Sequence, residues 1–255
     1  MASVTSTLDR AEDEAVRIVS EAQACGVTAR LIGGLAVRAH CPSANHGALE
    51  REYPDIDLVV VRKDGRNLEP LMQRLGYVPD RMFNTLNGDR RQLYRDPARG
   101  RQVDVFVGDF DMAHRIPMER RLGVEPLTVP LAELFLSKAQ IVALNHKDVK
   151  DLLALLLDHA VAEGDAETIN LAIVARLCAG DWGLYTTVNG TLGRVIESLD
   201  SDAVTLDAGQ SRLVRQRVTR MQTALEAAPK TVAWSVRARL GRRVPWYQEV
   251  EEVQR

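Results

Sequence analysis

The pattern of apolar residues changes near residue 125, and this change limits the folds that the chain can adopt. Before that point, short β-branched runs end at glycine turns and alternate with short helical patterns. From Pro130 onward, apolar residues recur at helical spacing in segments 131–144, 149–162 and 166–179, with two or three more helices to about residue 240. We therefore predict an α+β fold, with a small mixed β-sheet and flanking helices over residues 1–125 and an all-helical domain over residues 126–255.

The first 125 residues contain a regular series of predicted elements. A helix over 8–24 precedes a strand over 28–32, a Gly33-Gly34 turn and a helix over 35–40. After a loop over 41–54, the β-branched run 55–61 predicts a buried strand and 68–75 a helix. Three further segments are predicted to form an antiparallel meander, with Asn87-Gly88 as a hairpin turn: 81–86, 90–95 and 102–107.

Composition places the chain among globular proteins. Of its 255 residues, 45% are hydrophobic and 27% are charged, which excludes a disordered chain, a collagen-like repeat and a coiled-coil rod. Lys and Arg number 33 against 35 Asp and Glu, and a net charge of -2 argues against non-specific coating of nucleic acid. No apolar run approaches the roughly 18 residues of a membrane span and no signal peptide is visible, so we expect a cytoplasmic protein without a membrane partner.

Two carboxylates stand two residues apart in an apolar strand. Asp55 and Asp57 alternate with Ile56, so their side chains are predicted to leave the same face of the strand. Unpaired charges are costly to bury, whereas a hard divalent cation such as Mg²⁺ takes oxygen ligands. Asp104, in a second apolar strand, can supply a third ligand if the two strands lie side by side. The alternative is an acidic pair at a strand edge that binds water only.

A diglycine turn lies upstream of these acids. Gly33 and Gly34 stand where a predicted strand turns into a helix, and backbone N–H groups at such a position bind anions. The absence of side chains lets a phosphate approach the backbone closely. Taken alone, the pair is equally typical of an ordinary turn.

These motifs together resemble the nucleotidyltransferase superfamily of the DNA polymerase β type. The resemblance covers about residues 27–108, from Leu31-Ile32-Gly33-Gly34 through Asp55-Ile56-Asp57 to Val103-Asp104-Val105. It implies that Asp55, Asp57 and Asp104 are catalytic and hold two Mg²⁺ ions, while Gly33 and Gly34 bind the triphosphate of a nucleoside triphosphate. This chain has Gly-Gly where the family has Gly-Ser, and its spacer between the glycines and the acids is longer.

A second stretch resembles AbiEii-like nucleotidyltransferases. There a helical lysine, here Lys138, precedes a basic-Asp-x-x-Asp motif, here Lys147-Asp148 with Asp151. The resemblance implies that Lys138 faces the nucleotide phosphates, that Asp148 assists at the active site and that Asp151 has a structural role. The alternative is an ordinary helix surface, because Lys147 and Asp151 form an i, i+4 pair.

Two basic regions could also bind an anionic substrate. Arginines cluster on the predicted meander, and the segment 227–248 has five basic residues beside Trp234, Trp246 and Tyr247 with no acidic residue. The alternatives are solvated arginines and a terminal helix whose tryptophans dock on the core. The meander arginines are Arg81, Arg90, Arg91, Arg95, Arg99 and Arg101.

Other chemistries find no support in the sequence. The five histidines lack H-x-H or H-x-x-x-H spacing, and the three cysteines form no CxxC pair, so a histidine or zinc-knuckle metal site is not predicted. Ser137 and Cys178 have no recognisable base nearby, and the Walker A pattern is absent.

The sequence thus predicts a metal-dependent nucleotidyltransferase that moves a nucleoside monophosphate from a triphosphate to an acceptor hydroxyl. The acceptor is either tRNA, as in toxin-type enzymes, or a small hydroxylated molecule such as an aminoglycoside. An antitoxin-type protein is a possible cognate partner. The competing hypothesis is a catalytically silent nucleotide-binding regulator built on the same fold.

Overall fold

The computed structural model describes residues 6–201 and 204–249. The chain divides into two compact units, and each is assembled from separate stretches of sequence. The sheet unit comprises Met1–Ala39, Glu52–Asp111 and Pro117–Pro130, and the helical unit comprises His40–Arg51, Met112–Ile116 and Leu131–Arg255. The boundary predicted near residue 125 lies close to the last division. The sequence pattern did not indicate that residues 40–51 and 112–116 group with the helices.

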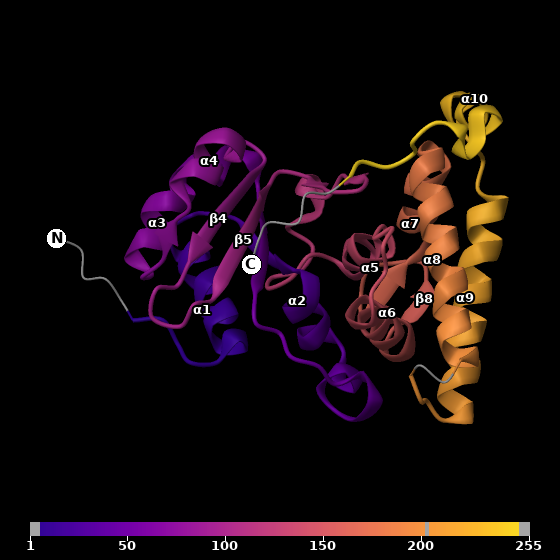
Figure 1. The fold of residues 1–255 in the computed structure, drawn as a ribbon, viewed down its shortest axis with the longest axis horizontal. Coiled ribbons are helices and arrows are strands. Elements are labelled where there is room, and N and C mark those ends of the chain that lie inside the picture. Colours follow the sequence, from indigo (N-terminus) through magenta and orange to yellow (C-terminus); the bar gives the residue numbers. More distant parts are fainter. Residues whose placement is uncertain (1–5, 202–203, 250–255) are drawn as a thin grey trace. The chain divides into compact units, whose positions relative to one another are not determined.

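A five-stranded mixed sheet forms the centre of the sheet unit (Figure 1). Its strand order is β1-β2-β5-β4-β3, in which β2 and β5 are parallel and the other neighbours are antiparallel. The apolar residues of β1, β2 and β5 are almost fully buried, as expected for β-branched runs in strands that are covered on both faces. The strands are β1 (Ala29–Ile32), β2 (Ile56–Val60), β3 (Val78–Pro79), β4 (Arg91–Arg95) and β5 (Gln102–Val107), and the short β6 (Phe110–Asp111) follows.

In the described part of the sheet unit, four α-helices accompany the sheet. In α1, Ala15, Ile18, Val19 and Ala22 recur at helical spacing and are buried, and the helix packs on β1. Helix α2 starts at the diglycine itself, two residues earlier than predicted. The helices are α1 (Ala11–Ala24), α2 (Gly33–His40), α3 (Leu68–Arg74) and α4 (Arg81–Asn87).

The strand predicted over 81–86 is wrong, because this segment forms helix α4. The Asp80 side chain accepts a hydrogen bond from the backbone N–H of Phe83 at 3.0 Å and caps the helix N-terminus. The Asn84 side chain then ties the helix to β4, accepting from the backbone N–H of Leu93 at 2.7 Å. Asn87-Gly88 therefore ends a helix instead of forming the predicted hairpin turn, and only the β4–β5 pair of the meander is present.

The outer edge of β1 is covered by a later segment of the chain. The backbone N–H of Leu31 donates to the carbonyl of Leu127, and the N–H of Val129 donates to the carbonyl of Leu31, both at 2.9 Å. Residues 127–129 thereby protect an edge that would otherwise expose unpaired backbone groups.

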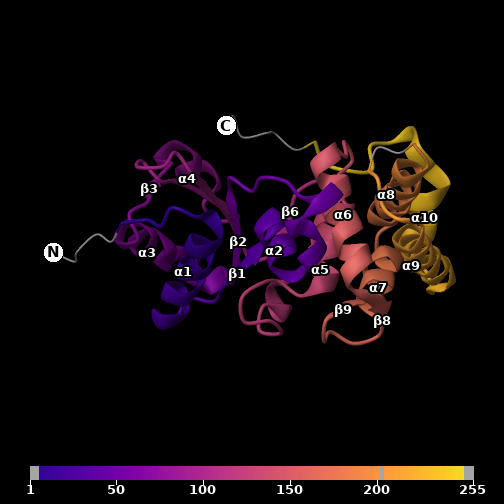
Figure 2. The same ribbon diagram turned by 90° about the horizontal axis from the view of Figure 1, so that it is seen from below.

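Within its described residues, the helical unit contains the α-helices α5 to α10 and one short pair of parallel strands (Figure 2). Helices α5 to α9 pack on one another through leucine, valine and alanine side chains, and α10 lies against α7 and α8. Its elements are β7 (Arg115–Ile116), α5 (Leu131–Ala139), α6 (His146–Asp158), β8 (Ala160–Ala162), β9 (Thr168–Asn170), α7 (Leu171–Gly180), α8 (Trp182–Asp200), α9 (Ala208–Ala227) and α10 (Val232–Leu240).

The strand pair corrects two predicted helix limits. Helix α6 stops at Asp158 instead of continuing to 162, because residues 160–162 pair with 168–170 as β8 and β9. The predicted helix 166–179 accordingly begins only at Leu171, where Asn170 caps it. Among the described residues, no helix is long and apolar enough to cross a membrane.

Candidate active site

The sheet register places two of the three predicted acids side by side. Strands β2 and β5 are neighbours, which meets the condition given above for a contribution from Asp104, and Asp57 lies directly opposite Asp104. On the other side of β2, Asp57 lies opposite Ile32, the last residue of β1 before the diglycine. The glycine turn and two carboxylates therefore occupy one level of the sheet, on three adjacent strands.

The Asp57 carboxylate lies directly against the backbone of Gly33. A Cβ atom at position 33 would be 2.1 Å from Asp57 Oδ2, so a side chain there would force Asp57 to move. Gly33 also has a φ of 70°, a left-handed conformation that favours glycine. Gly34 follows in the first turn of α2, where backbone N–H groups have no helical partner. Glycine is thus required at 33 for two independent steric reasons.

Asp104 is bound by an arginine of the neighbouring strand. The Arg91 Nε atom lies 2.9 Å from Asp104 Oδ1, and an Arg91 Nη atom donates to Oδ2, which makes the contact bidentate. The guanidinium also lies over the rings of Phe106 and Phe83, at 5.1 and 5.8 Å from their centroids. Asp104 is 6% exposed, so this is a largely buried ion pair held in place on several sides.

The charge balance at Arg91 reflects both acids. Burial lowers the pKa of Arg91, but the hydrogen bonds and charge of Asp104, together with the charge of Asp57, raise it more. The net pKa is raised, so the guanidinium is a permanent cation beside the two carboxylates. The sequence placed Arg91 in a cluster of arginines, but nothing in the pattern distinguished it from its neighbours.

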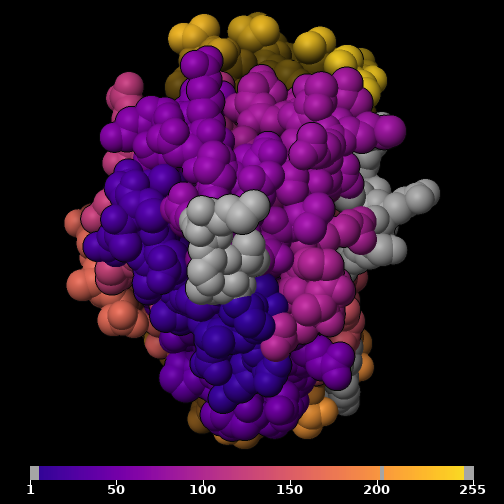
Figure 3. All heavy atoms as spheres, turned by 90° about the vertical axis from the view of Figure 1, so that its left-hand side faces the viewer, coloured from indigo at the N-terminus to yellow at the C-terminus, as the bar shows by residue number. Residues whose placement is uncertain are grey.

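Asp55 lies just before β2 and is half-buried. It borders a shallow hollow of about 430 Å³ together with Pro54, Asp9, Arg99 and Arg101. Arg99 binds Asp9 at 2.6 Å, so the hollow contains charges of both signs. The surface of the sheet unit, in indigo, purple and magenta, faces the viewer in Figure 3.

The acids offer the ligand chemistry that Mg²⁺ prefers. Asp57 and Asp104 present carboxylate oxygens from adjacent strands next to backbone amides, a donor set that suits a hard cation and a phosphate. Within the described residues, Asp55, Asp57 and Asp104 do not form a trio with ligand atoms all within 4.8 Å of one another. Arg91 already neutralises Asp104, so a cation there must share that carboxylate or displace the guanidinium.

Lys138 and Asp148 belong to the helical unit, where they join a buried ionic cluster. Lys138 Nζ lies 2.8 Å from Asp151 Oδ2 and 3.7 Å from Asp148 Oδ1. Arg51 also binds Asp151, with distances of 2.8 and 2.7 Å. Burial lowers the pKa of Lys138, but Asp151 and Asp148 raise it above its usual value. The structure therefore gives Lys138 two protein carboxylates as counter-ions.

Asp148 has a second structural role at the N-terminus of α6. Asn145 accepts hydrogen bonds from the backbone N–H groups of Lys147 and Asp148, at 2.9 and 3.1 Å. Asp148 accepts in return from the Asn145 N–H at 3.4 Å, which completes a capping box. The basic-Asp-x-x-Asp motif thus begins a helix and anchors a buried lysine.

The basic aromatic segment 227–248 largely packs on its own unit. Arg237 lies over the Trp182 ring at 4.7 Å from its centroid, and Lys230 donates to backbone carbonyls at the end of α9. The Trp246 indole donates to Thr187 at 3.2 Å. The docked-tryptophan interpretation therefore accounts for these contacts, while Arg239 and Arg243 are exposed.

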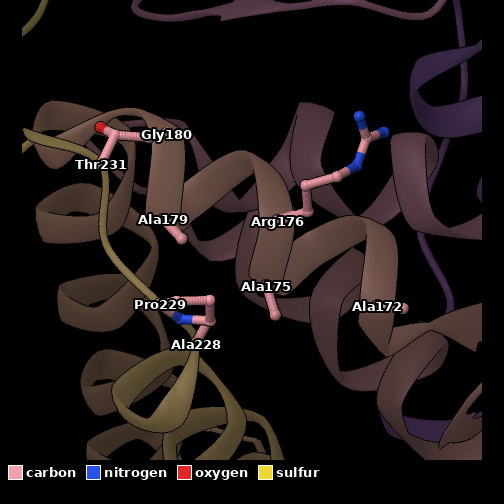
Figure 4. Close-up of a pocket in the computed structure, with 8 residues that line it drawn as sticks. All are labelled: Ala172, Ala175, Arg176, Ala179, Gly180, Ala228, Pro229 and Thr231. Carbon is pink, nitrogen blue, oxygen red and sulfur yellow. The ribbon is translucent and has the colours of Figure 1, made fainter. Parts of the chain in front are cut away.

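A second hollow in the helical unit has a different chemistry. It is lined mainly by alanines of α7 and by residues 228–231, as Figure 4 shows. The backbone N–H of Thr231 donates to the carbonyl of Ala179 at 3.2 Å and closes one end. With Arg176 as its single charged lining residue, this hollow lacks the acids that a nucleotide-transfer site needs. Its lining residues are Ala172, Ala175, Arg176, Ala179, Gly180, Ala228, Pro229 and Thr231.

Comparison with known proteins gives matches in structure only. No protein-family model matches the chain, and no curated protein matches its sequence. An antigenic nucleotidyltransferase-like protein from Paracoccidioides brasiliensis is 13% identical with a TM-score of 0.43, over 89% of this chain and 97% of that one. The antibiotic-resistance factor ANT(2'')-Ia is 14% identical with a TM-score of 0.36, over 55% and 78%. A tRNA nucleotidyltransferase in complex with a primer tRNA is 15% identical with a TM-score of 0.33, over 83% and 52%.

Proposed function

We propose that this chain is a metal-dependent nucleotidyltransferase that acts in the cytoplasm. The observation that carries the proposal is the position of Asp57, which lies against the Gly33 backbone on one side and opposite Asp104 on the other. A phosphate-binding turn and two metal-binding carboxylates on one level of a sheet are what the transfer of a phosphate group requires.

In this proposal the chain's residues position a nucleoside triphosphate. Backbone N–H groups at Gly33 and Gly34 bind phosphate oxygens at the positive end of α2. Asp55, Asp57 and Asp104 hold Mg²⁺, with two ions as the expected number. When bound, Mg²⁺ supplies charge that offsets the triphosphate and lowers the pKa of an acceptor hydroxyl. The acceptor oxygen then bonds to the α-phosphorus, the bond to the β-phosphate oxygen breaks, and pyrophosphate leaves.

Asp104 is poorly placed to accept the proton of the acceptor hydroxyl. A carboxylate that already accepts two hydrogen bonds from Arg91 has less capacity to take the acceptor's proton. The chain's contribution to the reaction is therefore orientation and charge, and the proton passes to solvent or to a released phosphate oxygen.

The acceptor belongs to one of two chemical classes. A tRNA acceptor would require an exposed basic surface. Arg239 and Arg243 are exposed basic residues that would belong to such a surface. An aminoglycoside would require acids near the site to receive its positive charges, and Asp9 and Asp55 border one hollow. Incubation with each of the four α-labelled triphosphates, with total tRNA or an aminoglycoside panel as acceptor, distinguishes the two classes by where the label appears.

The decisive test of the proposal is Asp57→Asn. This change removes one carboxylate charge while preserving shape, so transfer should fall by at least about a hundredfold, since metal and charge stabilisation contribute several kcal/mol. Asp89→Asn, at an exposed position on the same unit, is the matched control and should retain activity. Equal activity in the two variants would refute a catalytic role for Asp57.

A silent nucleotide-binding regulator is the second candidate, and the Arg91–Asp104 ion pair favours it. If the guanidinium permanently takes the position of a cation, the protein would bind nucleotide without transfer. Binding of a nucleotide with Mg²⁺, measured by calorimetry, together with no pyrophosphate release for any acceptor, would support the regulator. An antitoxin-type partner would be identified as a protein that co-purifies with this chain and suppresses its transfer activity.

A further inference from the structure

Two histidines that are 119 residues apart in the sequence meet in the helical unit. The rings of His40, at the end of α2, and His159, which follows α6, are 5.8 Å apart between centroids in an edge-to-face arrangement. Glu167, just before β9, completes a group of three side chains. One ligand atom from each residue lies within 4.8 Å of the other two.

The surroundings of His159 favour a cation at its Nδ1 atom. His159 Nε2 lies 3.2 Å from the carbonyl oxygen of His40, and His159 Nδ1 lies 3.3 Å from the carbonyl oxygen of Glu167. A neutral imidazole has one N–H, so it cannot donate to both carbonyls. If Nε2–H donates to the carbonyl oxygen of His40, the lone pair of Nδ1 faces the carbonyl and carboxylate oxygens of Glu167. A cation between Nδ1 and these oxygens would remove the repulsion between them. A metal-bound histidine usually donates its other N–H to a carbonyl in this way.

Glu167 adds a negative charge at the solvent side of the group. Its Oε2 atom lies 3.7 Å from His159 Nδ1, and its side chain is 78% exposed. Among the described residues, it is the non-glycine residue with a positive φ, 47°. This conformation directs both its carbonyl and its carboxylate toward a histidine that is 3% exposed. An ion can therefore reach the group from solvent while His159 anchors it from inside.

We propose that His40, His159 and Glu167 form a binding site for a divalent transition-metal ion, with Zn²⁺ as the best fit. Two imidazoles and one carboxylate are a ligand set that Zn²⁺ accepts, with a further position left for water. Ligands about 2.0–2.2 Å from zinc lie roughly 3.4 Å apart, so the 3.7 Å pair is nearly in place and the others need to close by about an ångström.

The site is distinct from the acids proposed to hold Mg²⁺. Its ligand atoms come from two imidazoles and one carboxylate that lie within 4.8 Å of one another. Imidazole nitrogen favours zinc over magnesium, whereas the Asp57 and Asp104 carboxylates favour the hard ion. All three residues belong to the helical unit, where the ion would join the start of the 40–51 segment to the loop between β8 and β9.

The test is zinc binding by the untagged, full-length protein after treatment with a chelator. Calorimetric titration with Zn²⁺ should show one equivalent whose affinity falls at least about tenfold in Glu167→Gln and in His40→Gln. Glu163→Gln and His46→Gln are matched controls, because each changes an exposed residue of the same type in the same segment. Zinc should also raise the melting temperature of the wild type and of both controls, but not of the two site variants.

Each outcome has a clear meaning. Glu167 is exposed, so Glu167→Gln should keep its fold, and circular dichroism checks this before the titration. The proposal is overturned if the wild type shows no saturable binding up to about 100 µM Zn²⁺, or if Glu167→Gln and Glu163→Gln bind equally. Asp57→Asn separates this site from the proposed function, since it should abolish transfer while its zinc titration matches that of the wild type.

Discussion

At the scale of single residues, Gly33 has the strictest steric requirement in the proposed site. An alanine Cβ would collide with Asp57 Oδ2 at 2.1 Å, and the φ of 70° is unfavourable for alanine. We expect Gly33→Ala to lower the free energy of unfolding by about 1–3 kcal/mol and to reduce transfer sharply, because Asp57 must move. Urea denaturation and pyrophosphate release measure the two effects.

A second glycine provides the control for this change. Gly190 lies in α8 with open space around it, so Gly190→Ala should stabilise the protein by about 0.5–1 kcal/mol through helix propensity. If Gly33→Ala behaved like Gly190→Ala, the close contact between the glycine turn and Asp57 would be contradicted.

Arg91 makes a further prediction at the residue scale. Arg91→Gln leaves the Asp104 carboxylate without its bidentate partner, so the variant should lose stability in the absence of metal. Added Mg²⁺ should then raise its melting temperature by more than that of the wild type, because the cation no longer competes with a guanidinium. Scanning calorimetry with and without Mg²⁺ measures this difference. An equal Mg²⁺ effect in both proteins would mean that Asp104 is not a metal ligand.

At the scale of elements, variants at the N-terminus of helix α6 distinguish a structural role of Asp148 from a catalytic one. Asn145→Ala and Asp148→Ala each break the capping box and should lower the free energy of unfolding by about 0.5–2 kcal/mol. Asp148 also lies near Lys138, so the larger loss is expected there. If both variants keep similar transfer activity under stable conditions, Asp148 is structural. A much lower kcat in Asp148→Ala alone would indicate contact with substrate.

Elements that local sequence determines were predicted more accurately than elements that depend on tertiary contacts. The strands β1, β2 and β5 were found within about two residues, because buried strands require β-branched runs between turns. Helix α4 was missed because it buries no residue and its apolar Met82 and Leu86 are exposed, so no core-facing stripe marks it as a helix. Its actual determinants are the Asp80 cap and the Asn84 contacts with β4, and the second of these depends on tertiary structure.

The candidate site was predictable to a similar limit. The sequence indicated two apolar strands that each carry an acid, but the pairing of Asp57 with Asp104 depended on the strand order of the sheet. The Arg91 contact depended on the β4–β5 register, and the meeting of His40 with His159 depended on the path of residues 40–51. Residue spacing in the sequence predicts neither contact, because both depend on tertiary packing and not on a local repeat.

At the scale of the whole molecule, the Arg51–Asp151–Lys138 cluster links stability to pH. Burial raises the pKa of Asp151, but Lys138 and Arg51 lower it more, so its folded-state pKa lies below the unfolded value. The stabilisation that ionised Asp151 contributes to the folded state is present above the unfolded-state pKa of about 3.9 and is lost as pH falls through the folded-state pKa. The raised pKa of Lys138 has the opposite sign, so its contribution is present below about pH 10.4 and is lost at higher pH.

Asp151→Asn tests this cluster. It leaves two largely buried cations without their shared carboxylate, and the free energy of unfolding near pH 7 should fall by about 3–5 kcal/mol. The loss should be smaller near about pH 3, below the unfolded-state pKa of about 3.9, because the carboxyl is largely protonated in the unfolded chain there and the stabilisation by ionised Asp151 is reduced. Denaturant titrations at both pH values measure it, with exposed Asp13→Asn as the control. A loss of the same size at both pH values would argue against a charge effect.

The interleaved order of the two units has a consequence for the newborn chain on the ribosome. The first unit needs residues 127–129 along β1, and the second needs residues 40–51, which are synthesised long before its helices. All residues of the sheet unit precede Leu131, so this unit can complete its fold during translation before the helices of the other unit are made. Residues 40–51 remain without the helices they pack on while about a hundred further residues are synthesised, and a chaperone would be of most use during this interval.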